Sequence, residues 1–376
     1  MGELNQTLQH LKNQLGFNQV EIGPLGTPIT IGFYEKWIGD SLHAGMGYLK
    51  DHMPTKKDPR VLNQNLNSVI TVTQSYFPTL HPLENPVPAR TATYAQNNDY
   101  HFWLKEKLTV IITELKIKHP EHDFLPFVDS GPILERNWAY ENGMGWFGKN
   151  TCLIHPQFGS LFFIAEILTT LPLNIGNGRA DLLTNASLTA ERQHTKLEPL
   201  PDFCGKCTKC IDICPTNALT APHVMQADRC ISYLTIESKT TPPLELREKM
   251  GDWFFGCDLC QTTCPWNEKV FRKLGVSEMP ATSTAKFLVL DDKKDIELTD
   301  FFRNILTSSN KQLAKQFLGT PLFRAGGNLK RNALIVIANK KMISLKPQVK
   351  TYLNHPKFSE LAAWCLQQLD QTKDPS

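Results

Sequence analysis

A cysteine-rich stretch, CGKCTKCIDICP at residues 204–215, decides how this chain is organised. Its cysteines follow the spacing C-x2-C-x2-C-x3-C and precede a proline: Cys204, Cys207, Cys210 and Cys214. This spacing is typical of bacterial ferredoxins, in which three of the thiolates bind one [4Fe-4S] cluster and the fourth binds a second cluster. The stretch therefore predicts another group of cysteines that completes both clusters.

The second group lies downstream and has four members: Cys230, Cys257, Cys260 and Cys264. The last of them precedes a proline, as the last cysteine of the first group does. Crossing of the fourth ligand assigns one cluster to Cys204, Cys207, Cys210 and Cys264. It assigns the other cluster to Cys214, Cys230, Cys257 and Cys260. Eight of the ten cysteines thus predict two complete [4Fe-4S] clusters.

Zinc is the alternative occupant, because C-x2-C pairs also build tetrahedral zinc sites. Zinc has no use for the two Cys-Pro endings, so the pattern favours iron and sulfur. Disulfides are not expected, since residues 1–17 lack the apolar core of a signal peptide and the chain should meet a reducing compartment. The remaining cysteines, Cys152 and Cys365, are expected to pack in hydrophobic cores.

The overall composition is that of a globular protein, with 41% hydrophobic and 20% charged residues. The most apolar run, residues 161–173, is too short to cross a bilayer and contains Glu166. We therefore expect a cytoplasmic protein that does not enter a membrane. The formal net charge of +3 neither requires nor excludes a polyanionic partner.

Pattern divides the chain into three parts. Residues 1–200 mix helical and strand-like patterns, which predicts an α/β domain. Residues 201–275 are rich in cysteine, glycine and proline, and residues 276–376 are almost entirely helical in pattern. Between the first two parts, residues 174–203 lack periodicity and predict a surface loop.

The first part should contain three strands, over Ser68–Phe77, Arg90–Ala95 and Phe124–Val128. A helix is expected from Leu104 and should end before Pro120. Two clusters alone need far fewer residues than this chain has, so the first part must hold the group that receives the electrons.

Asp129 is the first candidate for chemistry in this part. It follows an apolar strand and precedes Pro132, where a helix is expected to begin. Asp129 is therefore either a turn residue at a helix start or a catalytic acid. Residues 143–150, GMGWFGKN, also match dinucleotide and phosphate-loop patterns. A helix that stops at Gly143 is expected before them rather than a strand, so these matches are accidental, although close backbone approach to another large cofactor stays open.

The third part is expected to be helical over Leu329–Ala338 and Phe358–Leu369, with breaks at Gly326, Gly327 and Pro347. Eleven basic residues and no acidic residue fall between positions 301 and 359. A solvated helix surface usually mixes both signs, so this basic tail predicts a surface that faces a polyanion, with nucleic acid as the leading partner.

Five segments, taken together, resemble the epoxyqueuosine reductase family of cobalamin-dependent iron-sulfur enzymes. They are VDSGPILER (128–136), GMGWFGKNTCLIHPQFGSLFFIAEILT (143–169), CGKCTKCIDICPTNAL (204–219), RCISYLTIE (229–237) and FFGCDLCQTTCPWN (254–267). The segment PLFRAGGNLKRNALIVIANKK (321–341) is similar to the helical repeat that ends those proteins. The resemblance spans most of the chain, and residues 174–203 look like an insertion relative to the family.

The resemblance implies an α+β multidomain fold. Residues 1–200 would form a nitroreductase-like α/β cobalamin-binding catalytic domain and residues 201–275 a ferredoxin-like domain with two [4Fe-4S] clusters. Residues 276–376 would form an all-α HEAT-like domain that binds tRNA. The implied reaction is the last step of queuosine biosynthesis, in which epoxyqueuosine at the tRNA wobble position is reduced to an alkene with loss of water. The implied partners are that tRNA and a low-potential electron donor such as flavodoxin or ferredoxin.

The resemblance also implies the site residues. Asp129 is the implied proton donor. Cobalamin contacts are implied at Lys57, Arg60, Asn97, Tyr100, His101, Asp129, Lys149, Thr151, Leu153, His155, Ser160, Ser232 and Ser238. On the basic tail, the candidate tRNA contacts are Arg324, Lys330, Arg331, Lys340 and Lys341.

Two other functions are compatible with parts of the sequence. A corrinoid reductive dehalogenase would share the clusters and the cofactor, but those enzymes usually carry a twin-arginine export signal, which this sequence lacks. Such an enzyme also has little use for an acid-free basic tail. A non-catalytic electron-transfer protein would hold two clusters and retain no corrin.

Overall fold

The computed structural model describes residues 2–77, 81, 83, 84, 86–173, 203–276 and 292–371, without the side chains of residues 2 and 292–295. Most of the expected insertion, residues 174–202, lies outside the described residues. The chain forms two compact units. Unit 1 contains Met1–Pro78, Tyr100–Thr208 and Pro222–Val224, and unit 2 contains Thr79–Asp99, Lys209–Ala221 and Met225–Ser376.

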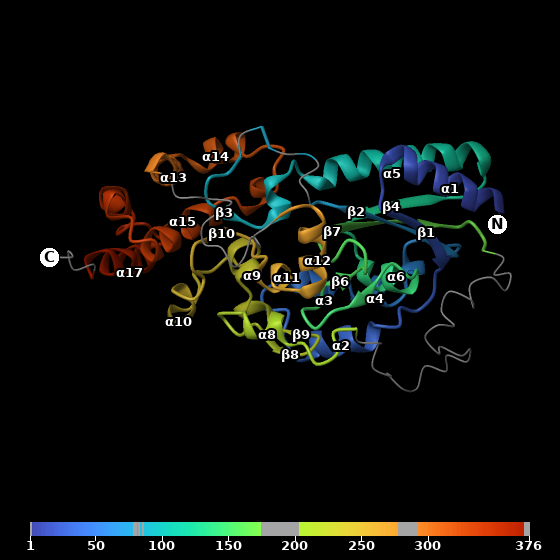
Figure 1. The fold of residues 1–376 in the computed structure, drawn as a ribbon, viewed down its shortest axis with the longest axis horizontal. Helices are drawn as coiled ribbons and strands as arrows, with labels where there is room; N and C mark the ends of the chain where they lie inside the picture. The colour runs from blue at the N-terminus through green and yellow to red at the C-terminus, as the bar shows by residue number, and fades with distance from the viewer. Residues whose placement is uncertain are drawn as a thin grey trace. The chain divides into compact units, whose positions relative to one another are not determined.

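Unit 1 is built on a four-stranded antiparallel sheet with the order β1-β2-β7-β4 (Figure 1). Its strands are β1 (Gln19–Pro24), β2 (Ser68–Ser75), β4 (Phe124–Val128) and β7 (Phe162–Thr169). A short hairpin joins β5 (Trp146–Phe147) to β6 (Leu153–Ile154). The helices are α1 (Gly2–Leu15), α2 (Ile31–Gly39), α3 (Gly47–Asp51), α4 (Met53–Lys57), η1 (Pro59–Val61), α5 (Tyr100–Lys118) and α6 (Glu135–Glu141).

Both faces of this sheet are covered by helices. The long helix α5 packs beside α1 on one face, while α6 packs against β2 and β7 on the other (Figure 1). The α5 face is apolar every three to four residues, with Leu104, Leu108 and Ile111 fully buried. The strands β2 and β7 are largely buried on both sides as a result, which explains why β7 is apolar at most positions rather than at every second one, while β2 buries polar residues beside its apolar ones.

Unit 2 joins the cysteine-rich region to the C-terminal helices. Its strands are β3 (Arg90–Thr91) and β10 (Trp253–Phe255), with the hairpin β8 (Leu219–Ala221) and β9 (Val224–Met225) at the division between the units. Its helices up to residue 273 are η2 (Thr93–Gln96), α8 (Lys209–Asp212), η3 (Ala227–Arg229), α9 (Ile231–Ile236), α10 (Leu244–Arg247), α11 (Leu259–Thr262) and α12 (Pro265–Lys273). Those of the tail are α13 (Asp292–Thr307), α14 (Asn310–Gln316), η4 (Pro321–Ala325), α15 (Asn328–Asn339), η5 (Ile343–Leu345), α16 (Lys346–Lys350) and α17 (Ser359–Asp370).

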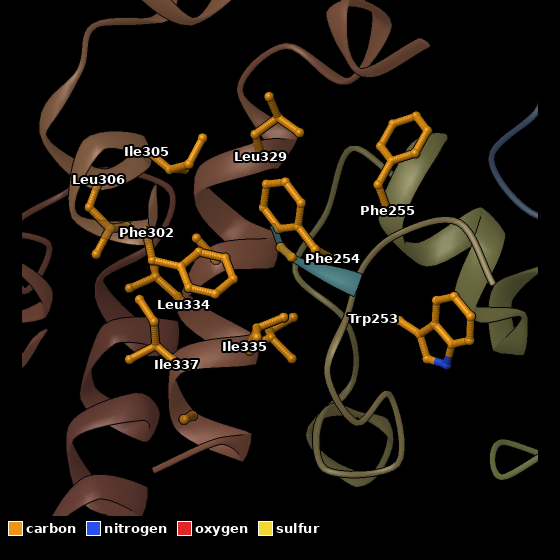
Figure 2. Packing of buried hydrophobic residues seen from close by; sticks show 14 of the residues in the cluster. Trp253, Phe254, Phe255, Phe302, Ile305, Leu306, Leu329, Leu334, Ile335 and Ile337 are labelled. Carbon is orange, nitrogen blue, oxygen red and sulfur yellow. The ribbon is translucent and has the colours of Figure 1, made fainter. Parts of the chain in front are cut away.

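One hydrophobic core runs through unit 2 (Figure 2). Strand β10 lies next to helix α15, and Phe254 points toward Leu334 and Phe302, whose ring meets that of Phe254 edge to face at 5.5 Å. Trp253 and Phe255 point the opposite way, as alternate residues of a strand must. The tail helices and the cysteine-rich region therefore share a core, while the three-part functional division stays a prediction.

The structure confirms most of the expected elements, including β2, β4, α5, α15 and α17. The expected strand over Arg90–Ala95 is wrong after Thr91, because the chain turns into η2. The expected helix start at Pro132 is also wrong, since α6 begins at Glu135. Within the described ranges, no helix has both the length and the apolar character needed to span a bilayer.

Candidate active site and cluster ligands

Asp129 lies at the end of β4, on unit 1, with its side chain 59% exposed. Two residues from the start of α5 meet its Oδ2 atom. The Tyr100 hydroxyl donates a hydrogen bond at 2.6 Å, and Nε2 of His101 lies 3.3 Å away. The Tyr100 ring is itself held by stacking on Phe163 of β7, at 4.1 Å between ring centroids. Strand and helix therefore bring together three residues that the resemblance implies: Tyr100, His101 and Asp129.

The backbone at Asp129 is unusual. Its φ is +56°, in the left-handed region, which costs a residue with a side chain about 1–2 kcal/mol. Aspartate is among the residues that tolerate this region best. Next along the chain, Gly131 packs so tightly that an added Cβ would lie 2.6 Å from Cδ1 of Phe127. The DSGP sequence thus builds a tight turn that aims the Asp129 carboxyl at Tyr100 and His101.

Three titratable residues lie near this turn: Lys56 and Glu166, which are buried, and Glu135, which is partly buried. The Nζ atom of Lys56 donates to the carbonyl of Ile133 at 2.9 Å, and burial lowers the pKa of this lysine. Burial, followed by the nearby charge of Asp129, raises the pKa of Glu135 to about 8. Burial also holds the pKa of Glu166 well above its ordinary range, with the charge of Glu135 as the second cause. Burial thus favours the protonated form of both glutamates.

A second segment of implied cofactor contacts, residues 148–160, surrounds the β5–β6 hairpin. Lys149 is buried, and its Nζ donates to the carbonyls of Gly205 at 2.6 Å and Cys207 at 3.1 Å. It therefore supports the loop that carries the first two cluster cysteines. Two glycines of the accidental motif are needed for packing, because a Cβ on Gly145 would lie 2.4 Å from the carbonyl oxygen of Ile154 and a Cβ on Gly148 would lie 2.5 Å from Cδ1 of Ile154.

The remaining implied contacts of unit 1 differ in exposure. Leu153, His155 and Ser160 are buried, and burial lowers the pKa of His155 to about 4, so its imidazole is neutral at physiological pH. Thr151 has a φ of +67°, and its carbonyl accepts a hydrogen bond from Arg136. By contrast, Lys57 and Arg60 are exposed and form ion pairs with Glu35 and Asp58.

Three implied contacts belong to unit 2. The Asn97 side chain is buried, and its Oδ1 accepts a hydrogen bond from the backbone N–H of His81. Ser232 is partly buried on α9, and Ser238 is buried with its hydroxyl beside that of Thr240. Their role at a cofactor stays a prediction.

Three of the cysteines that are predicted to bind the second cluster lie in unit 2. The thiol of Cys257 is close enough to Cys230 and Cys214 for their charges to interact, and burial raises the pKa of Cys257 and Cys230. Each sulfur also faces backbone N–H groups. Cys214 accepts from Ala218 at 3.3 Å, Cys230 from Tyr233 and Ser232, and Cys257 from Leu259. Such donors stabilise charge on cluster-bound thiolates, so these residues fit an iron-sulfur cluster.

The other predicted cluster cysteines lie in or beside short helices of the cysteine-rich region or in unit 1. Cys260 lies in α11, which packs against α8, the helix that carries Cys210. Cys264 is buried at the start of α12, where Pro265 occupies the first turn, as the Cys-Pro pattern requires. Cys204 and Cys207 belong to unit 1. Within the part of the chain that the structure describes, no group of three or more histidine, cysteine or acidic side chains is arranged for a single metal ion.

The two cysteines outside the cluster motifs differ. Cys365 is fully buried in the core of unit 2, which confirms its packing role. Cys152 is only partly buried, so the expectation that it fills a core is wrong. It lies in the β5–β6 turn, where its carbonyl accepts from the backbone of Gly148.

The basic tail requires one correction. Arg331 was predicted to contact RNA, but its side chain is fully buried, and its guanidinium donates to the carbonyls of Leu234, Ser238 and Thr240. Burial lowers its pKa to about 10. A guanidinium enclosed by three carbonyls cannot reach a phosphate, so Arg331 is a structural residue.

The other candidate RNA contacts lie nearer the surface. Arg324 is 48% exposed and pairs with Asp99, whereas Lys341 donates to the carbonyl of Gln368 at 2.8 Å. Lys330 lies over the ring of Tyr352, and Lys340 is partly buried. Besides Arg324, the exposed basic residues of the described tail are Lys311, Lys315, Lys350 and Lys357.

Sequence reasoning missed the buried carboxyls beneath Asp129. Glu135 belongs to the VDSGPILER segment, which gives no sign of burial, whereas Glu166 interrupts an apolar run. An acidic residue inside a strand that is otherwise apolar was the available signal.

Comparisons with known proteins agree with this description. A family described as "Epoxyqueuosine reductase QueG, DUF1730" matches residues 56–130, and a "4Fe-4S double cluster binding domain" matches residues 203–267. A curated epoxyqueuosine reductase from Leadbetterella byssophila is 39% identical over 233 residues, which cover 62% of this chain and 69% of the relative.

Two solved structures have the same fold. The epoxyqueuosine reductase from Bacillus subtilis, described with its aspartate catalytic loop swung out of the active site, is 25% identical with a TM-score of 0.75. The match covers 98% of this chain and 90% of that protein. An epoxyqueuosine reductase crystallised with an epoxyqueuosine-modified tRNA stem loop is 24% identical, with a TM-score of 0.74 over 99% of this chain and 95% of that one.

Proposed function

The chain belongs to the epoxyqueuosine reductase family, and we propose that Asp129 is the proton donor of the reaction it catalyses. The chain is an oxidoreductase that reduces epoxyqueuosine in tRNA to queuosine, and it carries a [4Fe-4S] double-cluster domain. Family membership excludes the dehalogenase and the non-catalytic electron carrier as the main function. The observation that supports Asp129 is its exposed carboxyl, held between Tyr100 and His101.

The chemistry requires such an acid. Conversion of an epoxide to an alkene and water consumes two electrons and two protons, and the carbon-oxygen bond breaks more easily when its oxygen receives a proton. A protonated Asp129 can supply that proton to the epoxide oxygen. The hydroxyl of Tyr100 and the Nε2 of His101 then stabilise the carboxylate that remains, because both can donate to Oδ2.

Cobalamin is the cofactor that we propose for unit 1. When bound, it would supply the low-potential electrons that reach the epoxide carbon. The types of residue around the β5–β6 hairpin are compatible with a large cofactor. The hairpin requires glycine at positions 145 and 148, and buried polar side chains between Lys149 and Ser160 flank it. Lys57, Arg60, Asn97, Ser232 and Ser238 remain candidate contacts. This domain would correspond to the nitroreductase-like part, residues 1–200.

The eight cysteines would relay the electrons. We assign Cys204, Cys207, Cys210 and Cys264 to one cluster and Cys214, Cys230, Cys257 and Cys260 to the other, since the motif spacing requires crossed ligands. Residues 201–275 form this ferredoxin-like part. A low-potential protein such as flavodoxin or ferredoxin would reduce the outer cluster.

The tail, residues 276–376, is proposed as the HEAT-like tRNA-binding part. Its solvated cations, together with Arg324, Lys330, Lys340 and Lys341, form the basic surface. Replacing Lys311 and Lys315 by glutamate should weaken tRNA binding and make it less dependent on salt, because fewer counterions are released. The matched control replaces Lys36 of unit 1, which already pairs with Asp40, and should leave the salt slope unchanged.

Reconstitution tests the cofactor assignment. Purified chain loaded with iron, sulfide and cobalamin should retain corrin absorbance after gel filtration and should carry both clusters. A chain that carries both clusters and retains no corrin would overturn the cobalamin proposal.

A further inference from the structure

We propose that Lys149 is a positioning residue for the first cluster: its buried ammonium group binds two carbonyls of the cysteine loop, residues 204–208, and so raises the reduction potential of that cluster. The first cluster is the one assigned to Cys204, Cys207, Cys210 and Cys264. The inference rests on the proposed function, because it uses this ligand assignment. It gives Lys149 a role other than the cobalamin contact that the resemblance implies.

The first observation is the contact between the Lys149 side chain and the cysteine loop. Its Nζ atom donates to the carbonyl oxygen of Gly205 at 2.6 Å and to that of Cys207 at 3.1 Å. Within the loop, the N–H of Cys207 donates to the carbonyl of Cys204 at 3.0 Å, and Gly205 has a φ of +53°. One ammonium group therefore fixes two peptide groups of the turn that carries two cluster cysteines.

The direction of these two peptide groups determines what the cluster meets. A trans peptide is planar, and its N–H points opposite to its C=O. The carbonyls of Gly205 and Cys207 share their peptide groups with the N–H groups of Lys206 and Thr208. Because both carbonyls face Lys149, both N–H groups point away from it, one on each side of Cys207. N–H groups that bind cluster sulfurs raise the potential, so the contact with Lys149 favours reduction.

The burial of the ammonium group adds a second effect. Lys149 is only 8% exposed. A buried charge is screened by salt much less than a charge on the surface. Reduction adds one electron to a [4Fe-4S] cluster, so a buried cation on its loop favours the reduced form. By contrast, Lys206 belongs to the loop itself but is exposed, so its charge is screened.

The main chain of Lys149 is fixed by the β5–β6 turn and by His223. In the turn, the N–H of Thr151 donates to the carbonyl of Gly148 at 2.8 Å, and the N–H of Gly148 donates to the carbonyl of Cys152 at 2.8 Å. His223 donates its backbone N–H to the carbonyl of Lys149 at 3.0 Å, and its Nδ1 lies 3.0 Å from the carbonyl oxygen of Gly148. The ammonium group therefore extends from a fixed turn to the cysteine loop.

Three substitutions separate the contact from general charge. Lys149→Met removes the charge and both hydrogen bonds, whereas Lys149→Arg keeps a charge and donors. Lys206→Met is the matched control, since it removes an exposed lysine from the same loop. The measurement is the midpoint potential of each cluster in the iron-loaded full chain, from a redox titration followed by electron paramagnetic resonance.

In Lys149→Met we expect one of the two midpoint potentials to fall by about 59 mV, which is a tenfold change in the equilibrium constant for one electron. The other potential should keep its wild-type value, and the iron content should stay at about eight atoms per chain. Lys149→Arg should stay close to the wild type, and Lys206→Met should leave both potentials unchanged. The potential that falls should belong to the signal that disappears in Cys207→Ser.

Wild-type values of both potentials in iron-loaded Lys149→Met overturn the proposal. A loss of corrin absorbance in that variant, without a change in either potential, would make Lys149 a cofactor contact instead. If Lys149→Met does not fold, unchanged potentials in the neutral variant Lys149→Gln contradict the proposal in the same way.

The variant Cys207→Ser separates this inference from the proposed function. An iron content of about four atoms per chain supports the ligand assignment, and wild-type potentials in Lys149→Met then refute the role of Lys149 alone. An iron content of about eight atoms in Cys207→Ser refutes the assignment itself and, with it, the inference.

Discussion

Replacing Arg331 by methionine should destabilise unit 2 and should not act on RNA binding through lost surface charge. The guanidinium donates to the backbone carbonyls of Leu234, Ser238 and Thr240 and to Oδ1 of Asn332. Methionine fills a similar volume but donates no hydrogen bond, so three buried backbone carbonyls lose a hydrogen-bond donor.

The magnitude follows from this count. A buried polar group left without a partner costs about 1–3 kcal/mol. Removing a buried charge returns part of that cost, since the guanidinium no longer has to be desolvated. We therefore expect the free energy of unfolding to fall by about 3 kcal/mol.

Urea unfolding of the cluster-loaded chain measures this change. Lys330→Met is the matched control, because Lys330 precedes Arg331 and lies over the ring of Tyr352. Its expected cost is below about 1 kcal/mol. At a urea concentration where both variants are folded, Arg331→Met should show the wild-type dependence of tRNA affinity on salt. The structural role is refuted if Arg331→Met has wild-type stability and a flattened salt slope.

Three further predictions concern the clusters, the hairpin and the buried carboxyls. Cys257→Ser should lower the iron content from about eight to about four atoms per chain, measured by iron and sulfide analysis, while Cys365→Ser should keep the full content; full iron in the first variant would contradict the ligand assignment. Gly145→Ala should lower the free energy of unfolding by about 3 kcal/mol, because the new Cβ would lie 2.4 Å from the carbonyl oxygen of Ile154 and φ is +154°. The control Gly143→Ala has open space around the new Cβ and should lower it by about 1 kcal/mol. Equal losses of stability in the two variants would argue against tight packing at Gly145. Burial raises the pKa of Glu166 in the folded chain, so its contribution to stability is fully present below pH 4.5 and declines as the pH rises above that value. Glu166→Gln should therefore flatten the fall of the free energy of unfolding with rising pH, and an unchanged slope in urea titrations would oppose it.

Much of the fold could be predicted from local pattern. The positions of helix α5 and of strands β2 and β4 are predicted by the spacing of apolar residues and by the residues that end these elements, such as Pro120. Ligand spacing gave the clusters because metal binding imposes fixed distances along the chain. The turn after Asp129 could not be placed, since Pro132 suits a helix start and also a loop, and the tight contact of Gly131 with Phe127 is not visible in sequence.

Charge alone misplaced Arg331. The residue lies three and four positions before Leu334 and Ile335, on the apolar face of α15, and this helical spacing was the signal of burial. A count of basic residues cannot distinguish a solvated cation from a buried one that donates hydrogen bonds to backbone carbonyls.

The most direct test of the account is nucleoside analysis of epoxyqueuosine-bearing tRNA treated with the reconstituted chain and a low-potential reductant. The wild-type chain should convert epoxyqueuosine to queuosine. Asp129→Asn should form none, while it retains the iron content and corrin absorbance of the wild type. Conversion by Asp129→Asn at the wild-type rate would contradict the central claim that Asp129 donates the proton.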